Sequence, residues 1–433
     1  MTNPYNVAVI GAGPAGIFGA RELAHQGARV ALFNRDIKPG GLAEYGIYLD
    51  KYHMKNGLRK QFSGTLALPN LDYYGNVTVG ANGDLTLDDL RALGFQAILV
   101  TVGAQGTKWL GLPGEDLEGV YHAKDVVYFY NHLPPYSQQS FRFGNRCAVI
   151  GAGNVMLDIA HFLARVKKVD EVIAIVRRGP VEVKFAKKEM EYVIDNLDKA
   201  ALDEEIKRVA PIMQAVHQDP QAGRATILEA LPHALPKTSA TRFRFVFLAS
   251  PVQMLGENGR LTHVEIEDNT LVEKDGEIKA KGAGNKRRLD VETVIFAIGD
   301  KVDESFGLPV EWNEFVKNPN PRFPIDGHSY ESPFEDVFVG GWSRKASSGL
   351  VGVARKDGIN SAKAVWGYLQ TKQPAETNAD ALSEKLKGLG KRVVLREDIK
   401  KLEATELAEA QKRGMEEFKF DNNDDMLKAM GLI

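Results

Sequence analysis

Largely apolar runs, most of which end at or just before a glycine, recur along the chain and predict buried parallel strands followed by tight turns. The clearest runs cover residues 7–10, 95–103, 147–150 and 292–299, and shorter ones cover 28–33, 171–176 and 336–341. Such runs are typical of strands that are covered on both faces. Segments 14–26 and 154–166 have helical periodicity, with Val155, Ile159 and Phe162 on one stripe of the second. The pattern therefore predicts strand–helix–strand units.

Other segments predict different elements. Alternation of apolar and polar residues at 242–248 and 262–266 predicts an antiparallel meander with one wet face. Helices are expected at 126–130, 358–369, 403–413 and 424–430. The aromatic stripe of the first favours core packing, and the charges of 403–413 favour a solvated helix face. Residues 372–391 are expected to form a solvated connection.

The order of these elements predicts an α/β fold with two doubly wound, Rossmann-like dinucleotide-binding domains. One domain is discontinuous, covering residues 1–107 and 303–433 with a C-terminal helical tail. The other, residues 108–302, is inserted into it. The 433 residues, 44% of them hydrophobic, suffice for two cores.

Two glycine-rich fingerprints stand 140 positions apart, each between an apolar run and a helical pattern. In such turns the glycines allow the backbone to approach a pyrophosphate, which lies at the positive end of the next helix. The candidate cofactor-binding residues are Gly11, Gly13, Pro14, Ala15 and Gly16 in the first fingerprint, and Gly151, Gly153, Asn154 and Val155 in the second. The repetition predicts two bound nucleotides with electron transfer between them.

Charge and hydropathy restrict the partners. The net charge of −2 gives no electrostatic case for nucleic acid or an anionic membrane as partner. No run of 18 apolar residues exists, so no transmembrane helix is expected. The first strand begins at Asn6 or Val7, which leaves no room for a signal peptide in this sequence, and a cytoplasmic location is expected.

Cys147 is the only cysteine, and it stands inside an apolar strand. A single cysteine excludes a disulfide, a Cys-x-x-Cys redox pair and a four-cysteine iron–sulfur cluster within this chain. We expect a buried core residue there. No metal site is expected.

The ends of the second strands distinguish the two nucleotides. An arginine at this position accommodates the 2′-phosphate of NADP, whereas a carboxylate accepts from the 2′-hydroxyl of a ribose. Arg177 and Arg178 follow the second strand of the inserted domain, which predicts NADP(H) there. Asn34 follows the corresponding strand of the first domain and suits the adenosine of FAD, although Arg35 stands beside it.

Several segments resemble the adrenodoxin reductase-like ferredoxin–NADP(+) reductases over nearly the whole chain. They are residues 41–47, 112–120, 153–160, 176–180 and 341–350, together with the tail from Glu406 to Leu427. The glutamate synthase small subunit is related. The resemblance implies FAD as cofactor, NADPH/NADP as substrate and a ferredoxin or similar small iron–sulfur protein as partner.

The resemblance also implies residue roles. Trp342, Gly349 and Asp158 match positions close to the reacting rings and are the candidate catalytic residues. The remaining candidate cofactor-binding residues are Asn34, Gly41, Leu42, Tyr45, Gly103, Arg177, Arg178, Glu189, Trp342, Gly349, Leu350 and Val351. Backbone N–H groups at a helix start near Gly349 would stabilise negative charge on a reduced flavin.

Some positions depart from the family pattern. Asn34 replaces the usual acid, and Lys51, with His53 nearby, stands where the family has a histidine paired with the acid that matches Asp158. Arg242 and Arg244 match docking arginines, whereas Ala249 replaces an expected basic residue. If they rim the flavin, four further cations would steer an acidic ferredoxin, and ordinary surface charge is the alternative: Arg344, Lys345, Arg355 and Lys356.

The sequence therefore predicts an FAD enzyme that passes electrons from NADPH to a ferredoxin-type iron–sulfur protein. The main alternative is the flavin subunit of a larger complex, similar to the glutamate synthase small subunit, although the cysteine-rich region of that group is absent. A flavin monooxygenase and a nucleotide sensor without turnover are further alternatives. The electron acceptor, the direction of flow, the strictness of the NADPH preference and the oligomeric state stay open.

Overall fold

The computed structural model describes residues 5–375 and 379–433, which form two compact units. Unit 1 comprises residues up to Thr107, Tyr128–Gln138 and Gly299–Ile433, and unit 2 comprises Lys108–Val127 and Gln139–Ile298. The domain bounds expected from the sequence place 128–138 and 299–302 in the inserted domain, whereas both segments belong to unit 1. Tyr128 and Leu133 instead pack on Tyr45 of unit 1.

Unit 1 is built on a parallel sheet of five strands in the order β17-β4-β1-β2-β3. The strands are β1 (Asn6–Ile10), β2 (Arg29–Asn34), β3 (Leu71–Gly75), β4 (Ala97–Val100) and β17 (Val337–Val339). Short pairs are formed by β5 (Gly106–Thr107) with β14 (Asp300–Lys301), and by β15 (Val310–Glu311) with β16 (Glu314–Phe315).

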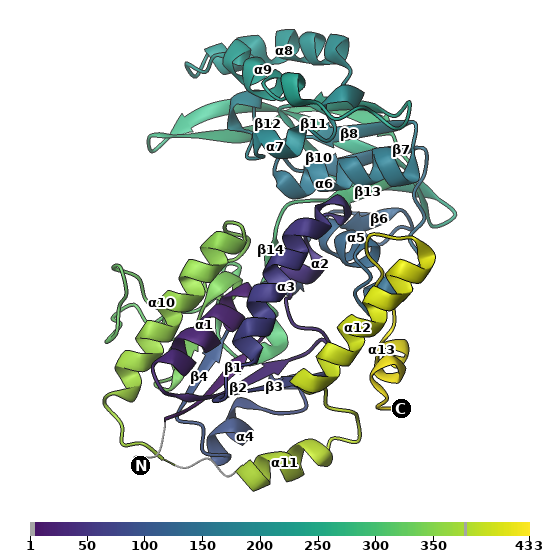
Figure 1. Cartoon of the computed structure of the whole chain (residues 1–433). Coiled ribbons are helices and arrows are strands. Elements are labelled where there is room, and N and C mark those ends of the chain that lie inside the picture. The colour runs from purple at the N-terminus through teal and green to yellow at the C-terminus, as the bar shows by residue number, and fades with distance from the viewer. Residues whose placement is uncertain (1–4, 376–378) are drawn as a thin grey trace. The chain divides into compact units, whose positions relative to one another are not determined.

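Helices cover both faces of this sheet because its strand residues alternate between two cores. Val7 and Val9 pack on the side of α1 and α10, whereas Ala8 and Ile10 face the other core. Figure 1 shows α1 and α10 side by side. The helices of unit 1 are α1 (Pro14–His25), α2 (Leu42–Tyr45), α3 (Tyr52–Leu66), α4 (Leu87–Ala92), α10 (Val351–Leu369), α11 (Ala379–Lys387), α12 (Arg396–Arg413) and α13 (Asn423–Met430).

Unit 2 repeats the plan with a second parallel sheet of five strands in the order β6-β13-β7-β8-β9. Its strands are β6 (Val120–His122), β7 (Arg146–Ile150), β8 (Glu171–Ile175), β9 (Arg242–Val246) and β13 (Thr293–Phe296). Its helices are α6 (Asn154–Phe162), α7 (Lys187–Met190), α8 (Lys199–Gln214) and α9 (Pro220–Leu228), and α5 (Ala123–Tyr130) crosses the division between the units. The predicted α/β class with two Rossmann-like units is confirmed.

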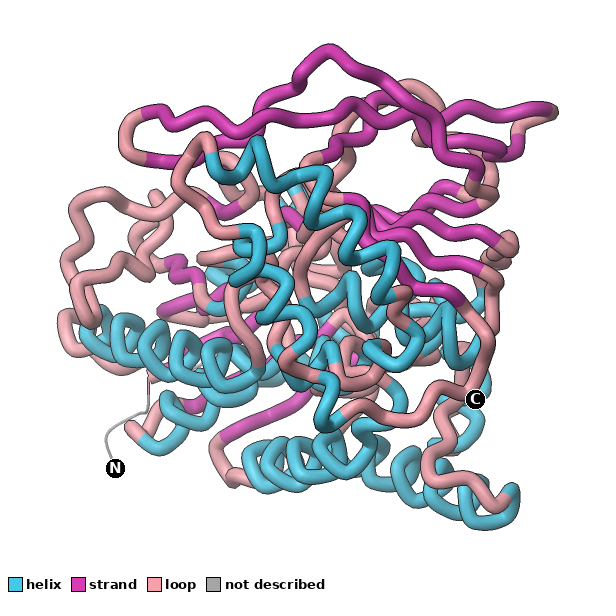
Figure 2. Tube along the Cα trace, turned by 90° about the horizontal axis from the view of Figure 1, so that it is seen from above, coloured by secondary structure: helices cyan, strands magenta, loops and turns pink. Residues whose placement is uncertain are grey.

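A three-stranded antiparallel meander covers one face of the second sheet. It consists of β10 (Ala249–Glu257), β11 (Arg260–Lys274) and β12 (Glu277–Asp290), whose long strands are visible in Figure 2. Val264 and Ile266 pack against Ile173 and Ile175 of the parallel sheet. β12 is an edge strand, and most of its residues are exposed.

Three expectations were wrong. Segment 242–248 forms no part of the meander, because β9 pairs in parallel with β8. Residues 372–391 contain α11, whose Leu382 and Leu386 are buried in the core of unit 1; residues 376–378 of that segment lie outside the described residues. The charged helix begins earlier, at Arg396, and buries Glu406 rather than presenting only a wet face.

Candidate functional site: two dinucleotide-binding turns

The turn between β1 and α1 has the geometry of a dinucleotide-binding loop. A Cβ on Gly16 would lie 1.9 Å from the carbonyl oxygen of Gly11, so only glycine allows this close approach. No side chain caps the first turn of α1, whose N-cap is Gly13. A Cβ on Gly13 would meet nothing within 4 Å, which leaves open space against the helix N-terminus. The turn thus fits a pyrophosphate held by backbone N–H groups.

Asn34, at the end of β2, connects this turn to the loop that follows β2 through side-chain hydrogen bonds. Its Oδ1 accepts from the Ala12 N–H at 3.0 Å, and its Nδ2 donates to the carbonyl oxygens of Asp36 and Lys38 at 2.8 and 3.0 Å. The side chain is buried, and these bonds occupy both amide protons. This arrangement does not support the direct ribose contact expected for Asn34, which instead positions the loop.

Arg35 is held by an acidic neighbour. Its Nε lies 3.0 Å from Oδ1 of Asp36, and this carboxylate raises the pKa of the guanidinium above its usual value. A second bond joins Arg35 to Gln105. The arginine at this strand end of unit 1 is therefore already paired with a carboxylate and is not available for a 2′-phosphate.

The segment after β2 folds back onto the glycine-rich turn. Gly40 donates its N–H to the Ala12 carbonyl at 2.7 Å, and α2 starts at Leu42. Tyr45 is only 1% exposed, with Nζ of Lys419 5.1 Å from its ring centre. Burial raises the pKa of Tyr45 well above its usual value. Gly41 and Leu42 lie beside the turn, whereas the ring of Tyr45 belongs to the core.

A buried ionic cluster, which sequence reasoning missed, fixes α2 to the C-terminal tail. It comprises Lys38, Glu44, Arg59, Glu406 and Lys419. Lys38 Nζ lies 2.5 Å from Glu406 and 3.4 Å from Glu44, and Arg59 and Lys419 lie 2.6 and 2.9 Å from Glu44. Burial alone would raise the pKa of Glu44, but the three cations hold it well below its usual value. The tail is thus an integral part of unit 1.

The loop between β17 and α10 is closed by internal hydrogen bonds. The Trp342 indole N–H donates to the Ser348 carbonyl at 3.0 Å, and Ser343 Oγ accepts from the Gly103 N–H at 2.9 Å. Gly349 has φ +76°, and a Cβ there would lie 2.5 Å from Val353. The loop delivers Leu350, 69% exposed, to the uncapped start of α10 at Val351. Trp342 and Gly349 therefore lie in one internally bonded loop, and Gly103 is attached to that loop through Ser343.

The expected steering role of Arg344 is wrong, because this side chain is committed inside unit 1. Arg344 forms a bidentate pair with Asp357, with its shortest distance 2.6 Å, and lies over the ring of Tyr330. Asp357 also accepts from the Gly341 N–H at 2.6 Å, so this pair anchors the Trp342 loop. Lys345, Arg355 and Lys356 are exposed.

The second glycine-rich turn, between β7 and α6, has the same open form. A Cβ on Gly153 would meet nothing within 4 Å, and α6 begins at Asn154 without a side-chain cap. Asn154 Oδ1 accepts from the Ala186 N–H at 2.7 Å, and the Ala152 carbonyl accepts from the Lys184 N–H at 2.8 Å. Residues 184–186 therefore line the turn. The adjacent Val155 is 42% exposed.

The two arginines after β8 differ in their surroundings. Arg177 is exposed and has no ion pair within the described part of the chain, whereas Arg178 lies 2.9 Å from Glu182. Sequence reasoning did not identify Glu182. Glu189 lies on α7, and Asp158 lies half-buried on α6 in unit 2. Lys51 and His53 belong to unit 1, where His53 lies against Tyr52.

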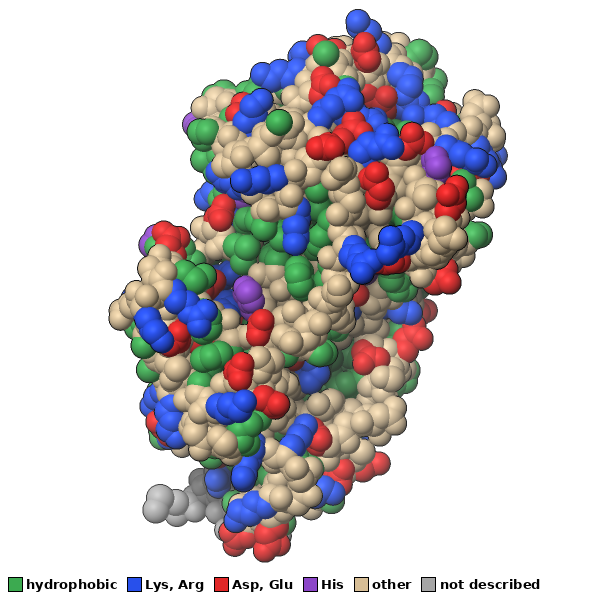
Figure 3. Space-filling model, turned by 90° about the vertical axis from the view of Figure 1, so that its right-hand side faces the viewer, with side chains coloured by type: hydrophobic (Ala, Val, Ile, Leu, Met, Phe, Trp, Pro, Cys, Tyr) green, Lys and Arg blue, Asp and Glu red, His purple; other side chains and the backbone are tan. Residues whose placement is uncertain are grey.

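The arginines expected to dock a partner, Arg242 and Arg244, are already paired. Both lie within 3.0 Å of Glu171, and Arg242 also lies 2.7 Å from Asp198. Ala249 is fully buried. On the face drawn in Figure 3, basic and acidic side chains are interspersed. These two arginines are thus poor candidates for a positively charged docking patch.

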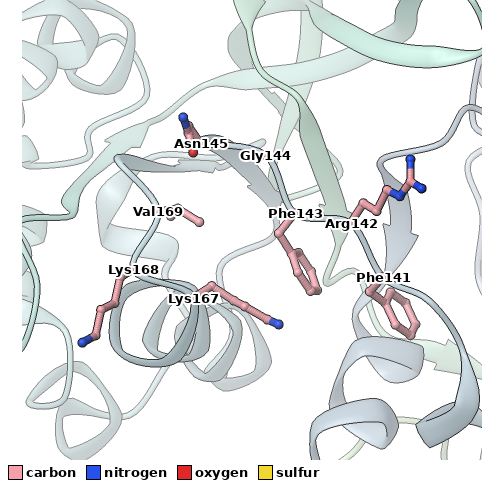
Figure 4. A pocket seen from close by; sticks show the side chains of 8 residues that line it. All are labelled: Phe141, Arg142, Phe143, Gly144, Asn145, Lys167, Lys168 and Val169. Carbon is pink, nitrogen blue, oxygen red and sulfur yellow. The ribbon is translucent and has the colours of Figure 1, made fainter.

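A pocket of about 490 Å³ lies in unit 2 (Figure 4). Its lining, residues 141–145 and 167–169, precedes β7 and β8, so the pocket lies at the amino ends of these strands, and the glycine-rich turn follows the opposite, carboxyl end of β7. Lys167 Nζ lies 5.2 Å from the ring centre of Phe143. Cys147 is buried nearby on β7, and burial raises its pKa to about 12. The expected core role of this cysteine is confirmed.

Two features are absent from the described residues. None of their helices combines the length and apolar character needed to cross a bilayer. Nowhere in residues 5–375 and 379–433 do three or more His, Cys, Asp or Glu side chains gather as a metal site would require.

Two dinucleotide-type turns on two parallel sheets define a pyridine-nucleotide-linked oxidoreductase architecture. The chain belongs to the pyridine nucleotide-disulphide oxidoreductase family, whose model matches residues 5–358. With Cys147 as its only cysteine, it has no dithiol of its own.

Named relatives are similar over most of the chain. NADPH-ferredoxin reductase FprA of Mycobacterium leprae is 26% identical over 458 residues, which cover 98% of both proteins. Mitochondrial NADPH:adrenodoxin oxidoreductase of Arabidopsis thaliana is 29% identical over 393 residues, or 81% of this chain and 79% of the relative. The structure of Mycobacterium tuberculosis FprA in complex with NADPH matches with a TM-score of 0.83 at 25% identity and covers 99% of both chains. The resemblance stated from the sequence is confirmed.

Proposed function

We propose that unit 1 binds FAD, that unit 2 binds NADPH, and that the chain passes electrons from NADPH through the flavin to a ferredoxin-type iron–sulfur protein. In domain terms, residues 1–107 and 303–433 form the FAD-binding domain and 108–302 the NADP-binding domain, with the boundaries adjusted to the two units. The names of the relatives, which are NADPH-ferredoxin and NADPH:adrenodoxin reductases, support the choice of donor and acceptor.

The observation that supports the cofactor assignment most directly is the difference between the two strand ends. After β2, Asn34 is bonded internally and Arg35 is paired with Asp36. After β8, the guanidinium of Arg177 is exposed and has no ion pair among the described residues. An available arginine at this position favours a 2′-phosphate, which NADPH has and FAD lacks.

Each unit offers its own residues for its ligand. The first turn and the N-terminus of α1 would hold the FAD pyrophosphate, and Gly41 and Leu42 flank that turn. The N–H groups of Leu350 and Val351, at the start of α10, would donate to the anionic edge of the flavin ring. Trp342 and Gly349 would fix that helix start. We assign Gly153, Asn154, Val155, Arg177 and Glu189 to NADPH, and Asp158 stays a proposed catalytic residue.

FAD, when bound, supplies the conversion of a two-electron donor into single-electron steps, which an iron–sulfur acceptor requires. The chain's own part is to bind and orient both ligands and to stabilise negative charge at the start of α10. No dithiol step is assigned, since the sequence has one buried cysteine.

Anaerobic titration tests this proposal. The purified protein should be yellow or become so with added FAD, NADPH should bleach the flavin absorbance, and a plant-type [2Fe–2S] ferredoxin added next should become reduced. Protein that takes up no FAD, or that is bleached by NADPH without reducing any ferredoxin offered, would contradict the flavin or the acceptor part respectively. We also propose a cytoplasmic location, which cell fractionation with an antibody would check.

A further inference from the structure

The two arginines after β8 are not equivalent, because one of them is bound to a carboxylate. Glu182 Oε2 accepts from Arg178 at 2.9 Å, whereas no acidic side chain pairs with Arg177 in the described chain. A strand end with two guanidiniums was expected to grip a 2′-phosphate with both. The structure leaves Arg177 available and places an anion beside Arg178.

Glu182 is fixed from several directions. It ends the short 3-10 turn Pro180–Glu182, where its N–H donates to the Gly179 carbonyl at 3.1 Å. Its Oε1 accepts from Gln218 Nε2 at 2.7 Å, while its Oε2 is held by Arg178. The side chain is only 15% exposed. The carboxylate is therefore a built part of the strand end rather than a mobile surface group.

We propose that Glu182 is a specificity-determining residue that weakens the preference for NADPH over NADH; this inference rests on the proposed function of unit 2. A carboxylate at this position repels a dianionic 2′-phosphate and competes with it for Arg178. The 2′-hydroxyl of NADH carries no charge and can donate to a carboxylate. The site thus combines one attractive and one repulsive group toward the same phosphate.

The same contacts also fit the opposite role, in which Glu182 favours NADPH binding by orienting Arg178. If Glu182 only orients Arg178 toward the phosphate, its removal should weaken NADPH binding, since the arginine would lose its position. The two roles predict opposite signs for the same substitution, so one measurement separates them.

The decisive variant is Glu182→Gln, which keeps the shape and the acceptor for Arg178 but removes the charge. We expect the ratio of kcat/KM for NADPH to that for NADH to rise on the order of tenfold, through a lower KM for NADPH, with kcat unchanged. Calorimetric Kd values for 2′,5′-ADP should fall by a similar factor, whereas those for 5′-AMP should not fall. An unchanged or lower ratio would overturn the inference.

Two companion variants complete the design. Glu204→Gln removes an exposed acid on α8 of the same unit and should leave the ratio unchanged. Arg177→Ala should raise the KM for NADPH more than that for NADH. If Arg177→Ala has no such effect, the NADP assignment of this strand end fails; if it does and Glu182→Gln leaves the ratio unchanged, only the role of Glu182 fails.

Discussion

The ammonium group of Lys38 lies 2.5 Å from the carboxylate of Glu406, although 368 positions separate the two residues. Both side chains are nearly inaccessible to solvent, with 3% and 7% exposure. Removing one partner of a buried ion pair leaves an uncompensated charge, which costs far more than the loss of a surface pair. This contact therefore makes the folding of the tail and of the β2–α2 loop interdependent.

Glu406→Gln should lower the free energy of unfolding by about 3 kcal/mol, because Lys38 would keep its charge without its nearest counterion. Urea denaturation followed by circular dichroism would measure the change. Glu409→Gln, on the same helix, removes a partly exposed carboxylate that pairs with the exposed Lys412 and Arg413, so it is the matched control and should be nearly neutral. Equal effects of the two substitutions would contradict a structural role for the buried pair.

Lys55 gives a pH-dependent prediction. It is fully buried, with Nζ 3.0 Å from Asn131 Oδ1, and burial together with Lys419 lowers its pKa from 10.5 to about 8. Between these two pH values the unfolded chain binds a proton on Lys55 that the folded chain does not, so its contribution to stability rises with pH.

The difference in unfolding free energy between the wild type and Lys55→Met should therefore grow in favour of the wild type from pH 8 to pH 10, by up to about 2 kcal/mol. Urea titrations at fixed pH would measure it, with Lys60→Met on the same helix as an exposed control. A difference that is constant with pH would show that Lys55 keeps an ordinary pKa.

Gly16→Ala should prevent tight FAD binding. The added methyl group would lie 1.9 Å from the Gly11 carbonyl oxygen and 2.5 Å from Thr101 Oγ1, so the turn must open. The flavin-to-protein absorbance ratio of the purified variant would report the loss. Gly64→Ala, in α3, meets nothing within 4 Å and should retain full flavin content.

Asp357→Asn should loosen the Trp342 loop. Asp357 holds Arg344, the Gly341 N–H and the Tyr330 hydroxyl, so neutralising it leaves Arg344 half-buried without its counterion. We expect weaker flavin retention on dialysis and a changed Trp342 fluorescence. Asp326→Asn removes an exposed acid near Lys356 and should alter neither property. Full retention in Asp357→Asn would remove this pair from the support of the site.

Local patterns predicted the parts of the fold that local chemistry determines. The apolar runs at β1, β4, β7 and β13 and the glycine spacing around Gly11 and Gly151 depend on neighbours within a few residues, and both turns formed as expected. The alternating sequence Arg-Phe-Arg-Phe-Val at 242–246 predicts a meander strand, but this segment forms the parallel strand β9. Phe243 and Phe245 are buried, but Glu171 on the adjacent parallel strand binds Arg242 and Arg244.

Contacts between distant segments could not be predicted in this way. A charge on α12 is typical of a solvated face, and only the folded chain brings Lys38 and Glu44 to Glu406 and Lys419. Glu182 was overlooked for a related reason. The role proposed for Glu182 depends on its hydrogen bonds with Arg178 and Gln218, which the spacing of residues along the sequence does not reveal.

The free edge of β12 has a consequence for how copies of this protein meet. Lys279, Lys281 and Lys286 stand along a strand that has a hydrogen-bonding partner on one side only. Two molecules that joined their sheets through this edge would bring rows of like charge together. Repulsion between these lysines opposes edge-to-edge association of the sheets. Replacing the three lysines with threonine is expected to increase aggregation of concentrated protein, measured by light scattering.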